Sequence, residues 1–187
     1  MAQSAVDVCN SALQRVGANS IISLADNSRE ARAVSLSFDS NRRDEIRKHN
    51  WNFAIKRVIL APDATAPAFE FTYQFTLPAD CLRVMRPPTT NLDWEIEGRK
   101  ILTNDSSVLN LKYIADITDV AQWDSSFYNV FASALALDIV EVLTQSNQKK
   151  AMLKEDYKDA IAEAKKMDSF EAGPEDPPDD EWWLARL

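Results

Sequence analysis

The chain has 187 residues, of which 45% are hydrophobic, so it is long enough to bury a core as one domain with a small extension. Its two cysteines are too few for a disulfide framework, and it shows neither a signal peptide nor a membrane-spanning run, so we expect a cytoplasmic protein or a particle assembled there. The formal charge of -8 argues against a general nucleic-acid binder, which needs a surplus of Lys and Arg for phosphate contacts.

The N-terminal residues have the pattern of two amphipathic helices. Ser4 and Asp7 form a capping pair before a short apolar stripe that ends at Gly17. Asp26 or Ser28 then caps a longer helix whose opposite face is charged.

The apolar pattern continues past His49, where Trp51 and Phe53 are candidate core anchors. It runs to Leu60 and stops before Pro62, which predicts a kink or a second helix in this stretch. We therefore expect residues 4–60 to be helical.

The middle of the chain has the alternation of β-strands. Residues 71–77 alternate apolar and polar side chains with a period of two, and Pro78 ends the run because it cannot donate to a strand ladder. Shorter strand candidates follow at 81–85, 94–97, 100–102 and 109–113. Together they predict a small antiparallel sheet over about 71–114, with one face in water and the other covered by helices.

Two further helices are expected after the sheet. A strongly apolar run reaches about Thr144, and a second amphipathic run ends at Met167, so the two should form an antiparallel hairpin. The predicted fold class is α+β: a mostly helical bundle from residues 4–60 and 125–167, with a small antiparallel β-sheet lobe inserted between helices. Residues 1–167 then form one domain.

Residues 168–187 form an extended tail of a different composition. They hold seven acidic residues and one arginine, and residues 171–181 are acidic, rich in proline and without a large apolar side chain, so that segment cannot fold alone. The tail ends in a hydrophobic hexamer, and its candidate partner-binding residues are Trp182, Trp183, Leu184, Arg186 and Leu187. One tail should bind weakly, but many copies around a ring would reinforce one another. The alternative is that the tail folds back on its own domain.

A basic cluster lies near the end of the second helix. The charge is +3 over residues 1–60 and -11 over residues 61–187, so basic groups gather in the N-terminal third. The cluster includes Arg42, Arg43, Arg47 and Lys48. It could be a solvated face, an interface that pairs with the acidic part of a neighbouring subunit, or a phosphate contact.

Catalytic constellations are weak in this sequence. His49 is the sole histidine, which leaves one possible Cys/His pairing, with Cys81. Glu95 and Glu97 share a strand face, where carboxylates are usually solvated rather than catalytic. With three glycines in the chain there is no phosphate-cradling loop. We expect no enzymatic activity, no cofactor and no bound metal.

Four segments in this order and spacing carry a resemblance to a known family: 49–54 (HNWNFA), 77–84 (LPADCLRV), 97–104 (EGRKILTN) and 111–114 (LKYI). With the opening run 5–13, they resemble the tail tubular protein A family, the head-to-tail adaptors of short-tailed phages. The likeness covers roughly residues 2–167, and the tail lies outside it. Asn50 stands where that family often has proline.

The resemblance implies a structural virion protein without enzymatic activity. It implies a dodecameric ring under the portal protein, with a distal tail or nozzle protein on the other side. Viral DNA would pass through the ring without sequence-specific binding, and no membrane would be involved. The family's helical part meets the portal and its β-rich part faces the tail.

Two other classes of function stay open from the residues alone. One is a soluble regulatory binding module whose Trp-Trp C-terminal peptide engages one partner. The other is an enzyme that uses His49, Cys81 or the Glu95 and Glu97 pair.

Overall fold

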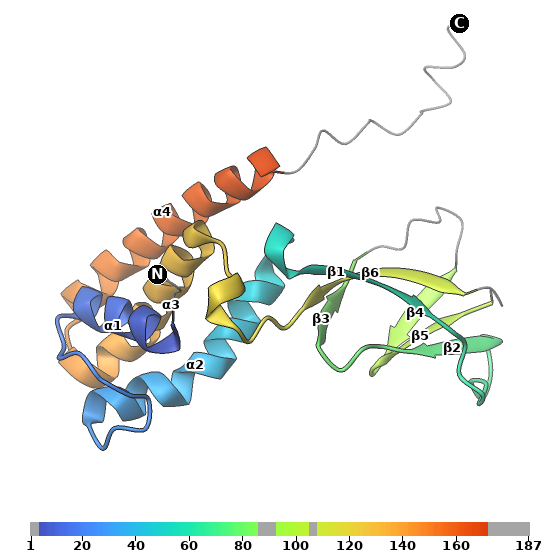
Figure 1. The fold of residues 1–187 in the computed structure, drawn as a ribbon, viewed down its shortest axis with the longest axis horizontal. Helices are drawn as coiled ribbons and strands as arrows, with labels where there is room; N and C mark the ends of the chain where they lie inside the picture. Colours follow the sequence, from blue (N-terminus) through green and yellow to red (C-terminus); the bar gives the residue numbers. More distant parts are fainter. Residues whose placement is uncertain (1–3, 86–92, 105–107, 172–187) are drawn as a thin grey trace, which may run out of the picture.

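The computed structural model describes residues 4–85, 93–104 and 108–171, and the chain forms two lobes that lie side by side (Figure 1). One lobe contains four α-helices: α1 (Ala5–Val16), α2 (Arg29–Lys48), α3 (Ser125–Thr144) and α4 (Asn147–Glu171). The other contains six strands: β1 (Ile55–Leu60), β2 (Tyr73–Thr76), β3 (Cys81–Val84), β4 (Trp94–Glu97), β5 (Lys100–Thr103) and β6 (Leu109–Ala115). The predicted α+β class with a β lobe inserted between helices is confirmed.

The helix ends follow the capping signals of the sequence. Ser4 and Asp7 form a reciprocal capping box at α1, and Gly17 ends that helix in the left-handed region at φ 81°. Ser28, not Asp26, accepts the hydrogen bond from Ala31 N at the start of α2. These local signals set both ends of α1 and the start of α2.

The central helix of the bundle is α3, which packs against α1, α2 and α4. Its side chains are apolar nearly all round, and Phe127, Phe131 and Leu135 are fully buried. The aromatic rings of Trp51 and Trp123 meet Phe127 edge-on, with centroids 5.1 and 5.2 Å apart. The prediction that Trp51 anchors the core is confirmed, since it is 1% exposed; Phe53 is partly buried beside it.

Among the described residues, α3 is also long and apolar enough to cross a membrane by length and composition. Its most apolar stretch is 56% buried inside the protein, as in the core helix of a globular bundle, so this property is weak evidence for a membrane span.

The strands form two small antiparallel sheets, with strand orders β1-β6-β3 and β2-β5-β4. In β6 the side chains of Leu109, Leu111 and Tyr113 are buried at alternate positions, as the period of two predicts. Phe75 of β2 and Ile101 of β5 are fully buried and belong to the same hydrophobic core as the buried side chains of β6. The two sheets therefore share one interior.

Three sequence expectations are corrected here. Residues 55–60, expected to be helical, form β1 and pair with β6 from Ile55 opposite Ile114 to Leu60 opposite Leu109. The predicted single sheet is two sheets, and the bundle stands beside them rather than over one face (Figure 1). The last helix continues beyond Met167 to Glu171, so Asp168 belongs to α4 and not to a linker.

Candidate functional site

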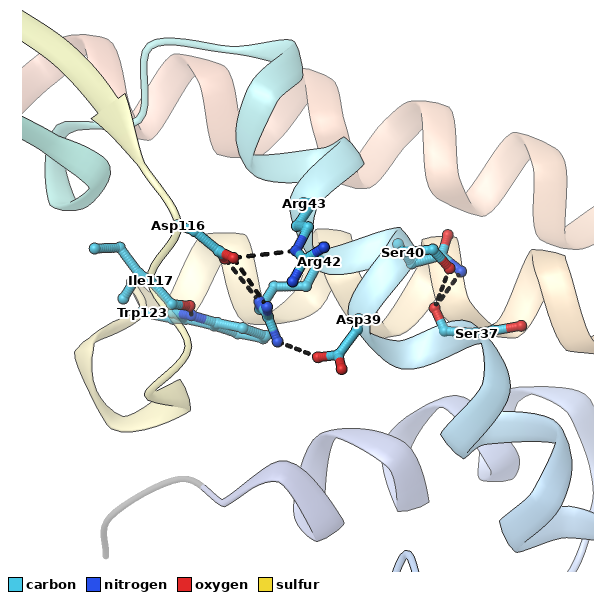
Figure 2. A network of polar contacts seen from close by, with 9 residues as sticks. Ser37, Asp39, Ser40, Arg42, Arg43, Asp116, Ile117 and Trp123 are labelled. Atoms are coloured by element: carbon cyan, nitrogen blue, oxygen red, sulfur yellow. Dashed lines mark hydrogen bonds and ion pairs between the residues drawn. The ribbon is translucent and has the colours of Figure 1, made fainter. Parts of the chain in front are cut away.

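The basic cluster of the sequence lies where α2 meets the β lobe, a region we call the joint. Arg42 is only 4% exposed, and its guanidinium donates to both oxygens of Asp116, from Nε at 2.9 Å and Nη2 at 3.1 Å. Asp39 accepts a further bond from Arg42, and Arg43 Nε lies 3.2 Å from Asp116 Oδ2 (Figure 2). Asp116 directly follows β6, so this network ties α2 to the chain leaving the β lobe.

The Arg42 guanidinium is held in its charged form. Burial opposes that charge, but the hydrogen bonds and charges of Asp116 and Asp39 outweigh it and raise the pKa of Arg42. A forked guanidinium suits a bidentate carboxylate, and both groups lose water together. Arg42 is therefore an internal structural charge and is not available to an outside partner.

Lys48 is also satisfied within the chain. Its ammonium lies 2.7 Å from Glu45 Oε1 and 2.8 Å from Asp44 Oδ2. Glu45 is buried and also accepts a bond from the Tyr157 hydroxyl at 2.9 Å, which joins α2 to α4. Burial works against the charge of Lys48, but the bonds to Asp44 and Glu45 raise its pKa.

Arg43 and Arg47 remain on the surface. The Arg43 side chain is 60% exposed despite its contact with Asp116. Arg47 is exposed and donates from Nη1 to the backbone oxygen of Leu82 in β3 at 2.6 Å. Of the four predicted residues, these two can still meet a partner.

A second polar group completes the joint on the strand side. Asp80 accepts bonds from Lys56 Nζ at 2.8 Å and from the Tyr113 hydroxyl at 3.1 Å. Burial raises the pKa of Tyr113 to about 12, and the hydrogen bond to Asp80 adds to that shift. The Arg99 guanidinium donates to the backbone oxygens of Pro78 and Ala79, so the β4–β5 turn is fixed against the segment before β3.

The end of α4 closes the joint from the other side. Asp168 Oδ1 accepts a bond from the backbone N–H of Asn52 at 2.9 Å, and its backbone oxygen accepts another from Asn52 Nδ2 at 2.8 Å. Its second carboxylate oxygen lies 3.2 Å from His49 Nε2. This helix end is thereby fixed to the segment between α2 and β1.

The catalytic candidates of the sequence occupy separate places. His49 pairs with Asp168, whereas Cys81 is buried in β3, and burial raises the pKa of its thiol, the reverse of an activated nucleophile. Glu95 and Glu97 are exposed on β4. Within residues 4–85, 93–104 and 108–171, no group of three or more His, Cys, Asp or Glu side chains could hold a metal ion.

The five candidate tail residues lie outside the described residues. Conversely, sequence reasoning missed the carboxylates that organise the joint: Asp80, Asp116 and Asp168. Asp80 lies within segment 77–84, one of the four that resemble the adaptor family. Asp116 directly follows the last strand, where a polar side chain can reach a neighbouring element. Nothing in the sequence paired Asp168 with Asn52, because 116 positions separate them.

No protein-family model matches this chain, and no curated protein matches it either.

Proposed function

We propose that this protein is a structural virion protein, a head-to-tail connector that forms a ring between a portal protein and a distal tail protein. The observation that carries the proposal is the composition of the joint. Each of the four sequence segments that resemble the adaptor family supplies a side chain to it: Asn52, Asp80, Arg99 and Tyr113. Asn52 bonds to Asp168 of the helical lobe, and the other three side chains hold the strands and turns of the β lobe together beside the joint. The family-like residues therefore lie where the two lobes meet, as a connector with a fixed shape requires.

Exposed apolar side chains on both lobes support the same proposal. On the helical lobe Ile22 is 92% exposed and Leu36 84%; on the β lobe Phe69 is 80% exposed and Ile59 69%. A contiguous patch of such residues marks a surface that contacts other proteins. Exposed apolar side chains on both lobes are what a molecule that joins one partner at each lobe requires.

The charge of the chain fits passage of DNA through the ring. With a net charge of -8, carboxylates that line a channel would repel phosphate and let the DNA slide without sequence-specific binding. The proposal has no catalytic step, no cofactor and no membrane.

The test is light scattering on the purified chain, alone and mixed with the portal ring encoded by the same genome. We expect a portal complex that carries many copies of this chain. A shortened form of this chain that ends at Phe170 lacks the C-terminal hexamer with its two tryptophans. We expect it to keep its fold and to bind the portal more weakly. Failure of both proteins to bind the portal would contradict the proposal, and one-to-one binding to a cellular partner would favour a regulatory module.

A further inference from the structure

A groove of about 690 Å³ lies on the helical lobe between α1 and α4, with the N-terminal part of α3 as its floor. One of its walls is acidic, because Asp156, Asp159 and Glu163 repeat at helical spacing along α4. All three are exposed, and their carboxylates make no ion pair or side-chain hydrogen bond with another residue in the described ranges. Met152 and Met167, 52% and 46% exposed, extend the same face at either end.

The α1 wall adds one opposing charge, that of Arg15. Its guanidinium donates to the neutral acceptors Ser133 Oγ at 2.5 Å and Asn129 Oδ1 at 3.4 Å on α3. Three carboxylates therefore face one guanidinium in this groove, which leaves an excess of negative charge.

The outer face of α2 has the complementary properties. Arg32, Leu36, Arg43 and Arg47 repeat at helical spacing, and Leu36 is 84% exposed. Asp39 falls on the same face, so three arginines there outnumber one carboxylate. Arg32 and Arg47 donate to backbone oxygens, those of Ser28 and Leu82, and form no ion pair with a described carboxylate. We call the three arginines and Leu36 the α2 stripe.

The stripe is somewhat longer than the groove. It runs from Arg32 to Arg47, about 22 Å at 1.5 Å per residue, and the α4 residues that line the groove run from Asp156 to Met167, about 17 Å. Each surface combines charged side chains with exposed apolar ones. The net charge of the stripe is positive, and that of the groove is negative.

The two surfaces lie on opposite sides of α3. Asn129 lines the groove, whereas Asp138 accepts a bond from Asn41 of α2 at 3.2 Å. Nine residues separate Asn129 from Asp138, about two and a half helical turns, so they project in opposite directions. A molecule with complementary surfaces on opposite sides associates head to tail.

We propose that the α2 stripe of one copy docks into the acidic groove of the next copy, and that this contact builds the ring. The inference rests on the proposed connector function, since it names the surfaces that join its subunits. The contact is heterologous, so each subunit uses both surfaces, and a rotation that closes gives a ring. Because exposed charges contribute, salt weakens the contact.

Two charge-reversed proteins test the pairing. The groove variant carries Asp159→Lys and Glu163→Lys, and the stripe variant carries Arg32→Glu and Arg47→Glu. Sedimentation velocity over a concentration series measures self-association, and circular dichroism checks the fold. We expect wild type to form multimers, and each variant alone to associate at least about tenfold more weakly because like charges then face each other.

An equal mixture of the two variants is the decisive sample. The wild-type stripe of one then meets the wild-type groove of the other, and the two reversed surfaces also attract, so every contact is restored. We expect multimers to return in the mixture. Matched controls with the same change in charge are Glu95→Lys with Glu97→Lys, and Lys154→Glu with Lys165→Glu, all exposed and away from both surfaces; they should associate as wild type does.

Each outcome decides between the two proposals. Multimers that persist in the groove variant, whose altered side chains have no described partner to lose, would overturn the surface assignment and leave the connector function standing. The same conclusion follows if two folded variants do not rescue each other. A wild-type chain that stays monomeric both alone and with the portal ring would overturn both proposals.

Discussion

At the scale of single residues, Arg42 shows how a charged side chain can belong to the core. It lies four positions after Phe38 and four before Ile46, both of which are buried, so it falls on the apolar face of α2. That spacing was visible in the sequence, although we grouped Arg42 with surface arginines. Its partner was not visible, because Asp116 lies 74 positions further along the chain.

Replacing Asp116 tests this pairing. Asp116→Ala leaves the buried Arg42 guanidinium without its bidentate partner, and Asp39 alone compensates only part of the loss. We expect the free energy of unfolding to fall by about 3 kcal/mol, measured by urea titration. The double variant Arg42→Met with Asp116→Leu removes both charges and should lose less stability than Asp116→Ala; an equal or larger loss would show that the buried charge is not the cause.

At the scale of elements, the helices were predicted better than the strands. Capping signals and apolar periodicity placed α1 and α3 almost to the residue, because both are local properties of the chain. The sequence pattern predicts residues 55–60 to be helical only weakly, because a short apolar run has no decisive period. Their β-branched side chains at Ile55, Val58 and Ile59 favoured a strand, but pairing with β6, some fifty positions away, is what determines it.

The turn between α3 and α4 gives a prediction at this scale. Gln145 caps α3 in the left-handed region at φ 54°, where a side chain is strained and glycine is not. Gln145→Gly should therefore raise the free energy of unfolding by about 1 kcal/mol and the melting temperature by a few degrees, measured by calorimetry.

Gly17 provides the matched control, since it caps α1 at φ 81° and already has the favourable residue. Gly17→Ala should lower stability by a similar amount. A Gln145→Gly protein that melts below wild type would mean that flexibility of the unfolded chain outweighs the strain.

At the scale of the whole molecule, acid sensitivity is spread over both lobes. Burial raises the pKa of Asp63, Asp80 and Asp124, but hydrogen bonds lower each one more: from Thr76 and Lys100 to Asp63, from Lys56 and Tyr113 to Asp80, and from Ser126 to Asp124. Their folded pKa values lie below the usual value of about 4, so between the two values the unfolded chain binds more protons.

The stabilising contribution of these carboxylates is complete above about pH 4 and is lost as the pH falls through the lower folded pKa values. We expect the urea midpoint to change little between about pH 7 and pH 5 on their account and to fall below pH 4. Asp80→Asn and Asp124→Asn should each flatten that fall. A midpoint that stays constant down to pH 2 would contradict this prediction.

The overall arrangement was predicted in part. A β lobe inserted between helices followed from the order of the patterns along the chain, and that order was sufficient for the α+β class. The relation between the lobes did not follow, because it depends on contacts such as Arg42 with Asp116 and Asn52 with Asp168, which no local pattern encodes. The candidate docking surfaces were partly visible, since pairing with an acidic neighbouring subunit was one interpretation of the basic cluster, but the groove between α1 and α4 depends on the packing around α3.

The insertion of the β lobe between α2 and α3 has a mechanical consequence. The chain enters the β lobe through β1 and leaves it through β6, and these strands are antiparallel neighbours (Figure 1). Their ends at the joint are Ile55 and Ile114, which lie opposite each other. A pull that separates the lobes is therefore shared by two covalent strands drawn in the same direction. The ladder between β1 and β6 is then not sheared, and tension reaches the helical bundle without opening the sheet.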